Sequence, residues 1–187
     1  DEETPEFIPS FTYKSLTVGM HLLGCVKRIT DLNLIISLPY GTEGKAAITE
    51  ISESLTELIK QYEDSEEDIS LPRLEDLFEV GQIVFCIVAA VDAKSKSVTL
   101  SLKPNLLNLN LDISDLGVGM HLSGSIKSKE EKGYTVSFGT SFQGFLPHKE
   151  VFEKNLKIHQ TVIFSIASLN PRTRTVTVTL NPDKISN

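Results

Sequence analysis

Apolar and polar residues alternate along much of the chain, most regularly in its second half. At 134–138, Tyr, Val and Phe alternate with Thr and Ser, and at 175–180, Val and Leu alternate with Thr. A period of two places one set of side chains on each face of a strand, and the mixture of an apolar and a polar set is typical of antiparallel sheets with one buried face. We expect five such runs in each half of the chain, so the pattern predicts an all-β protein.

The strand pattern recurs because the sequence contains an internal repeat. The segment 16–27, LTVGMHLLGCVK, returns one hundred residues later as LGVGMHLSGSIK at 116–127. Near the end of each copy the offset is seventy-eight, since 100–104 (LSLKP) aligns with 178–182 (VTLNP). The first copy is therefore longer by the difference between the two offsets, 22 residues. Repeats of roughly eighty residues predict two small domains of one kind.

The insertion falls between Ile48 and Phe78, after the third strand of the first copy. In the same place the second copy has only 148–155, enough for one or two helical turns. In the first copy apolar residues recur there at helical spacing, and the acidic run 63–68 follows as a solvated loop. Five short strands with a helix between the third and fourth is the order of an OB-fold. The predicted fold is two tandem five-stranded OB-fold barrels with short helices between strands three and four.

The segment between the copies, 105–115, contains four leucines and one isoleucine. Exposing them together would be unfavourable, so we expect this linker to dock on the barrels rather than act as a flexible tether. Because prolines fall at matching ends of the two copies, we expect the chain to be the N-terminal part of a longer array. The predicted order is a lead-in at 1–15 with Phe7, Ile8, Phe11 and Tyr13, a first barrel at 16–104 with an acidic helical insertion at about 52–77, the linker at 105–115, a second barrel at 116–182, and the start of another linker at 183–187.

The chain carries a formal net charge of −7, which at first sight argues against nucleic acid as a partner. The charge is unevenly distributed, however. Residues 1–104 hold nine basic and eighteen acidic side chains, whereas 105–187 hold nine and seven. Residues 53–79 alone contain ten acids and two bases. The acidity therefore belongs mainly to the insertion, and the second copy has a small basic excess.

Several function classes find no support in the sequence. It has no apolar run long enough to span a membrane and no signal-peptide pattern at its start, so we expect a soluble intracellular protein that does not bind membranes. Cys25 and Cys86 have no partners at metal spacing and are interpreted as strand residues. His21 and His121 lack a paired acid or nucleophile and are expected at the surface. We expect no enzyme activity, no cofactor, no metal and no small-molecule substrate, because the sequence has no phosphate loop, catalytic triad or metal cluster.

The repeat resembles the S1-type RNA-binding domain. The resemblance rests on the glycine-opened first strand, the Gly44 or Gly144 turn into strand three, and a closing hairpin with Val80-Gly-Gln, Val91-Asp and Leu100-Ser-Leu-Lys-Pro. It covers 16–104 and 116–182.

More narrowly, Leu22-Leu-Gly-Cys-Val-Lys-Arg-Ile-Thr-Asp and Ile36-Ser-Leu-Pro-Tyr-Gly-Thr-Glu-Gly, followed by a long acidic insertion, are similar to the first module of the ribosomal-RNA-processing protein five family. The resemblance implies a nucleolar, non-catalytic factor built from many such repeats. Its implied partners are single-stranded precursor ribosomal RNA and pre-ribosome assembly proteins.

In the S1 family, RNA crosses a face made by two aromatics near the start of strand two, a histidine in strand three and an Asp/Arg pair between strands four and five. Aromatic rings stack on bases and cations hold phosphates. Neither copy fills the aromatic or histidine places with those residue types. The first copy reads Leu32, Ile35, Ala47, Asp92 and Lys96; the second reads Lys132, Thr135, Pro147, Asn170 and Arg174.

The sequence still offers RNA a set of cationic side chains that border the expected face. Such cations can bind the phosphates of an RNA backbone. A solvated basic edge of a soluble barrel is the competing interpretation. The candidate RNA-binding residues are Lys127, Lys129, Lys132, His148, Arg172 and Arg174 in the second copy and Lys27, Arg28 and Lys96 in the first.

The fourth strand of the first copy, 83–90, is apolar on both faces. An outward apolar patch would suit a protein partner or the linker leucines, and packing under the insertion helix is the alternative. The candidate docking residues are Leu32, Ile35, Ile83, Phe85 and Ile87. A protein-docking scaffold within the pre-ribosome, with little RNA affinity of its own, is accordingly the second functional hypothesis.

Overall fold

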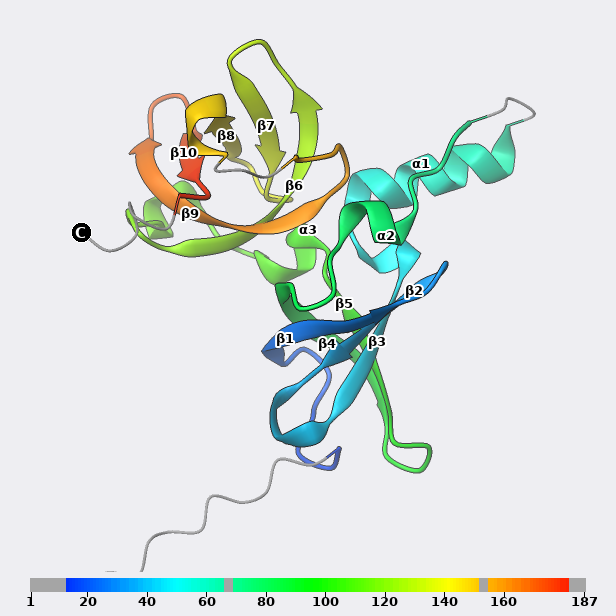
Figure 1. The fold of residues 1–187 in the computed structure, drawn as a ribbon. Helices are drawn as coiled ribbons and strands as arrows, with labels where there is room; N and C mark the ends of the chain where they lie inside the picture. The colour runs from blue at the N-terminus through cyan, green and yellow to red at the C-terminus, as the bar shows by residue number, and fades with distance from the viewer. Residues whose placement is uncertain (1–12, 66–68, 152–154, 182–187) are drawn as a thin grey trace, which may run out of the picture.

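The computed structural model describes residues 13–65, 69–151 and 155–181 and contains two closed five-stranded barrels, one below the other in the view of Figure 1. The predicted fold class, two tandem OB-fold barrels, is thereby confirmed. The expected lead-in residues Phe7, Ile8 and Phe11, part of the acidic run, and the 183–187 segment lie outside the described residues.

The first barrel closes in the order β1-β2-β3-β5-β4. All its neighbours pair antiparallel except β3 and β5, which run parallel and complete the closure. Short 3-10 turns flank β3. The elements are β1 His21–Ile29, β2 Asn33–Ser37, η1 Pro39–Gly41, β3 Glu43–Ala47, η2 Ile48–Glu50, β4 Ile83–Asp92 and β5 Ser97–Ser101.

The second barrel repeats this topology as β6-β7-β8-β10-β9, with β8 and β10 as the parallel pair. Its core centres on Phe138, Phe142 and Phe164, whose rings contact one another at centroid separations of 5.5 and 6.4 Å from Phe138. The elements are β6 His121–Lys129, β7 Gly133–Ser137, β8 Gln143–Pro147, η4 His148–Glu150, β9 Thr161–Asn170 and β10 Thr175–Thr179.

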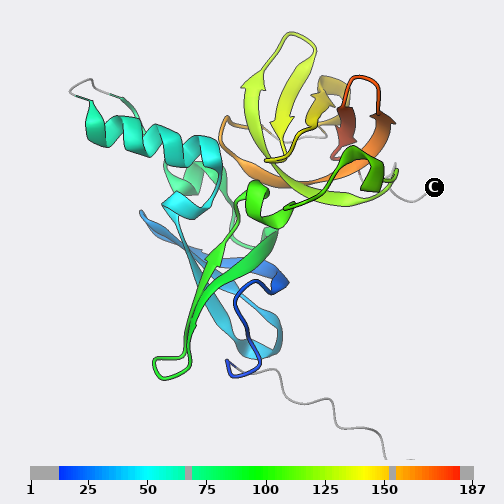
Figure 2. The same cartoon turned by 180° about the vertical axis from the view of Figure 1, so that it is seen from behind.

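The insertion forms two helices, α1 Glu53–Asp64 and α2 Leu74–Leu77. Ser52 caps α1 by accepting a hydrogen bond from the Leu55 backbone N–H at 3.2 Å. Leu55, Leu74 and Leu77 are buried in the first core. The start of α1 therefore packs on the core of the first barrel. Its acidic end points away from both barrels in both views (Figures 1 and 2).

The linker docks on the second barrel. It contains the short helix α3 Pro104–Leu107 and the 3-10 turn η3 Ile113–Asp115. Between them Asn108 is buried, and its side-chain amide donates to the carbonyls of Ser123 at 2.8 Å and Phe138 at 3.0 Å. The linker backbone packs so closely that a Cβ at Gly139 would lie 2.4 Å from Asn105. A glycine is required at 139 by this approach and by its φ of 67°.

The two barrels also contact each other directly through the start of the insertion and the loop before β9. Thr161 Oγ1 donates to the Ile51 carbonyl at 2.8 Å, and His159 Nδ1 lies 2.8 Å from Ser54 Oγ. Lys157 pairs with Asp76 at 3.6 Å. The insertion is thus part of the junction between the barrels as well as of the first core.

His159 occupies an unusual backbone conformation for a residue with a side chain. Its φ is 72°, and the equivalent residue of the first barrel is Gly81, with φ 92°. A non-glycine residue in this left-handed region costs about 1–2 kcal/mol. In the second barrel this cost falls on His159, whose imidazole contacts Ser54 of the first barrel's insertion.

We predict that His159→Gly loosens the junction without destabilising the second barrel, because it removes the bridge to Ser54 and relieves the strained backbone. The measurement is ¹⁵N relaxation, which gives a rotational correlation time for each barrel. The two times should be equal in the parent chain and shorter in His159→Gly. His148→Ala, whose imidazole contacts the Glu130 carbonyl within its own barrel, is the control. Unchanged correlation times in His159→Gly would show that the imidazole does not hold the junction.

We also predict that docking of the barrels weakens as the pH falls. Burial lowers the pKa of His159 below its ordinary value of 6.5, since the imidazolium is poorly solvated there. Between that lowered pKa and 6.5 the undocked form binds more protons than the docked form, so acidification through this window favours undocking. The same relaxation measurement at pH 7.5 and pH 5 checks this, and His159→Gln should remove most of the pH dependence.

Candidate nucleic-acid interface

One outward-facing row of side chains crosses the second barrel. Thr135 on β7 lies opposite Phe145 on β8, and Phe145 lies opposite Thr177 on β10. The flanking residues Gly144 and Leu146 are buried, so Phe145 must point outward, where it is half-buried. An aromatic ring between two threonines is a flat surface on which a base can stack.

Cations lie at both ends of this row. Lys129 and Lys132 are exposed at the β6–β7 turn, and Arg172 is exposed at the β9–β10 turn. The end of β8 lies beside the first turn, since Pro147 pairs with Gly133, and its start lies beside the second, since Gln143 pairs with Thr175. The two basic turns therefore flank Phe145. Within the described part of the chain, these three cations form no ion pair.

The remaining predicted residues of the second barrel lie around the same face. Lys127 is exposed at the position where the β6–β7 register shifts. His148 is exposed on η4, where Nε2 lies 3.2 Å from the Glu130 carbonyl and the ring meets Tyr134 edge-on at 5.4 Å. The imidazole of His148 is thus fixed beside Lys132, whose carbonyl accepts the His148 backbone N–H at 3.1 Å.

Arg174 is held by the chain itself. Its guanidinium pairs with Asp112 of the linker and donates to Ser141 Oγ. The hydrogen bond from Arg174 is the main reason that the pKa of Asp112 lies below its ordinary value. Among the candidate cations of the second barrel, Arg174 is therefore already engaged.

The same row in the first barrel has a different chemistry. Arg28 lies opposite Ile35, Ile35 opposite Lys45, and Lys45 opposite Thr99. Lys45 takes the place that Phe145 has in the second barrel. Lys27 pairs with Glu43 beside this row, and Lys96 is exposed in the β4–β5 turn. The described row Arg28–Ile35–Lys45–Thr99 thus offers cations and contains no aromatic ring.

Phe145 and Lys45 were not predicted from the sequence. The prediction carried over only the places that the S1 family uses, and in strand three that place is Pro147 or Ala47. Phe145 lies two residues before Pro147 in strand three. Strict alternation along this strand, with Gly144 and Leu146 buried, would have placed Phe145 on the outward face.

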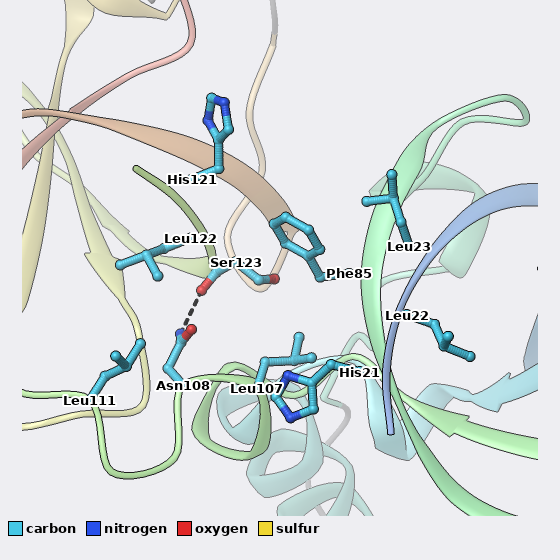
Figure 3. A pocket seen from close by; sticks show the side chains of 10 residues that line it. All are labelled: His21, Leu22, Leu23, Phe85, Leu107, Asn108, Leu111, His121, Leu122 and Ser123. Carbon is cyan, nitrogen blue, oxygen red and sulfur yellow. Dashed lines mark hydrogen bonds between the residues drawn. The ribbon is translucent and has the colours of Figure 1, made fainter. Parts of the chain in front are cut away.

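The predicted docking residues of the first barrel fall into two groups. Phe85 lines a pocket of about 300 Å³ that both barrels and the linker build (Figure 3). Ile83 lines a second cleft facing Val162 and Ile163 of β9, and Ile87 lies opposite His21 within its own barrel. Leu32, 64% exposed, and Ile35 lie away from this junction, at the β1–β2 turn and in the outward row. The structure thus brings β4 against the second barrel, and leaves Leu32 and Ile35 apart from it.

The pocket in Figure 3 is lined by equivalent residues of the two repeats. His21 and Leu22 come from β1, and His121 and Leu122 come from β6, with Asn108 of the linker bonded to Ser123. At this pocket, the corresponding strands β1 and β6 of the two barrels both contribute lining residues.

Other chemistry is not apparent in the described residues. They contain no group of three or more His, Cys, Asp and Glu side chains placed to hold a metal ion, and none of their helices has the length and apolarity needed to cross a membrane. Burial raises the pKa of the Cys86 thiol to about 12, so this cysteine is protonated at neutral pH and a poor nucleophile.

Comparison with known proteins identifies relatives of the chain. Residues 16–102 match the family model described as RRP5 S1 domain. The chain is 37% identical to the mouse protein RRP5 homolog over 145 residues, which is 75% of this chain and 8% of that protein. It is 39% identical to the human protein RRP5 homolog over 72% of this chain and 7% of that protein. The rRNA biogenesis protein RRP5 of Arabidopsis thaliana is 30% identical over 97% of this chain and 10% of its own length. The chain thus spans about a tenth or less of these relatives.

Proposed function

Residues 16–102 form an S1 domain that resembles those of RRP5, and from this premise we propose that the chain is an RNA-binding module of a ribosome-biogenesis factor. In this proposal the second barrel binds single-stranded precursor ribosomal RNA on its β7–β8–β10 face. The observation that carries it is the half-buried Phe145 between two exposed basic turns. The proposed location is the nucleolus, and the proposed role is binding rather than catalysis.

Each part of the face has a separate task in this proposal. The ring of Phe145 stacks on one base, which any base sequence permits because every base has a π-face. Lys129 and Lys132 at one end and Arg172 at the other contact phosphates on either side of that base. Lys127 and His148 extend the basic rim. The first barrel contributes phosphate contacts through Arg28, Lys45 and Lys96.

A second candidate function is protein docking on the first barrel, with pre-ribosome assembly proteins as partners. The observation that favours it is Leu32, which is 64% exposed in the β1–β2 turn and lines neither cleft of the junction. Association that is insensitive to salt and lost in Leu32→Ser would support this candidate over RNA binding.

We predict that Phe145→Ala weakens RNA binding by about 1–3 kcal/mol, roughly 5- to 150-fold, because a stacked base loses its platform. The measurement is fluorescence anisotropy with a labelled single strand of about twelve nucleotides. Phe145→Leu, which keeps apolar volume, should also weaken binding, and Phe145→Trp should restore it. Tyr62→Ala on α1, another exposed aromatic, is the matched control. Equal affinity of Phe145→Ala and the parent chain would contradict the proposed face.

The basic turns should determine the salt dependence of binding. Replacing Lys129, Lys132 and Arg172 by Gln should lower the slope of log K against log salt concentration by about 2 units, since each lost phosphate contact removes about 0.7 for a single strand. A triple variant with Lys14, Lys60 and Arg73 replaced by Gln removes the same charge from exposed positions outside the proposed face. If both triple variants lower the slope equally, RNA binds through net charge and the proposed face is wrong.

A further inference from the structure

The linker presents an acid to the RNA face of the second barrel. Asp112 pairs with Arg174, and Arg174 lies in the β9–β10 turn that flanks Phe145. Ser141 Oγ accepts a second hydrogen bond from the same guanidinium nitrogen. A carboxylate and a phosphate bind a guanidinium through the same donors, so they compete for it.

The backbone conformation of Arg174 is shared by the equivalent residue of the first barrel. Arg174 has a φ of 52°, in the left-handed region where glycine or asparagine is ordinarily found. Lys96, its equivalent in the first barrel, has a φ of 53°. Both repeats therefore hold a basic residue in a conformation that disfavours it, at the same corner of the barrel. Strained backbone conformations cluster at functional sites, although Tyr40, Asn110 and His159 also have a positive φ in this chain.

The acid, in contrast, is present in one repeat only. The residue that aligns with Asp112 at the hundred-residue offset is Thr12, which carries no charge. Among the described residues, Lys96 forms no ion pair. Among the residues that the structure describes, contact with an acid at this turn therefore distinguishes the second barrel from the first.

We propose that Asp112 competes with an RNA phosphate for Arg174, so that the linker lowers the affinity of the second barrel for RNA. This inference rests on the proposed RNA-binding function of that barrel. An RNA phosphate that takes Arg174 must displace Asp112, and the cost of breaking the ion pair is subtracted from the binding free energy. Replacing Asp112 with a neutral residue removes the competing carboxylate and leaves Arg174 at the same place in the β9–β10 turn.

The competition also couples RNA binding to the linker. Asp112 starts the η3 turn, where its backbone N–H donates to Asp115 Oδ2 at 2.8 Å. It follows Leu111, which lines the pocket between the barrels. If docking of this segment weakens RNA binding, RNA binding weakens docking of the segment to the same extent. RNA should therefore speed hydrogen exchange of the amides around 111–116.

The experiment is a double-mutant cycle in the intact chain, read by anisotropy with the same labelled RNA at low and physiological salt. Asp112→Asn should tighten binding by about two- to fivefold, the range expected for an exposed ion pair. In an Arg174→Gln background the same change should have no effect. Asp115→Asn, which removes one charge from the same turn without touching Arg174, should change affinity by less than Asp112→Asn. Hydrogen exchange of the linker, with and without RNA, gives a readout independent of affinity.

The outcomes separate this inference from the function on which it rests. Tighter binding of Asp112→Asn, abolished by Arg174→Gln, supports the competition. Unchanged or weaker binding of Asp112→Asn, in a chain that does bind RNA, overturns the competition and leaves the RNA face intact; weaker binding would mean that Asp112 positions Arg174 for RNA. Absence of RNA binding in the parent chain and in Asp112→Asn alike would contradict the proposed function itself.

Discussion

Closure of a five-stranded barrel determines which side chains each repeat can offer to a partner. The parallel pairs β3–β5 and β8–β10 complete the closure, and with the register fixed every second residue faces the core. Gly144 and Leu146 are buried for this reason, and Phe145 between them must face outward. The same constraint places Lys45 outward in the first barrel. Two barrels with one topology thus present different chemistry, because the residues at their outward positions differ, with Phe145 in one row and Lys45 in the other.

The junction between the barrels depends on elements that the first repeat alone possesses. The insertion supplies Ile51, Ser54 and Asp76 to contacts with the second barrel, and the linker supplies Asn108. These contacts lie on the β4 side of the first barrel, and the outward residues Thr135, Phe145 and Thr177 of the second barrel stay half-buried. The acidic end of α1 points away from both barrels (Figure 2), so its charge is kept apart from the basic turns.

Much of this architecture could be predicted from the sequence because it rests on period and repetition. The alternation at 175–180 and the hundred-residue repeat were sufficient for two barrels, and the linker leucines were sufficient to expect docking. The site was harder to predict. Phe145 occupies a place that family resemblance does not mark, and the pairing of Arg174 with Asp112 joins residues 62 positions apart in the sequence, which no local pattern reveals. Phe85 likewise lines a pocket that both barrels and the linker build, so its surroundings depend on how the two domains pack together.

The most direct test of the account is to map RNA onto the chain by NMR. Titration of an unlabelled single-stranded RNA into the ¹⁵N-labelled chain should shift the amide resonances of Thr135, Phe145 and Thr177 first, together with those of the two basic turns, while resonances at the junction change little. Shifts confined to the junction, or to the first barrel alone, would contradict the claim that the β7–β8–β10 face binds RNA.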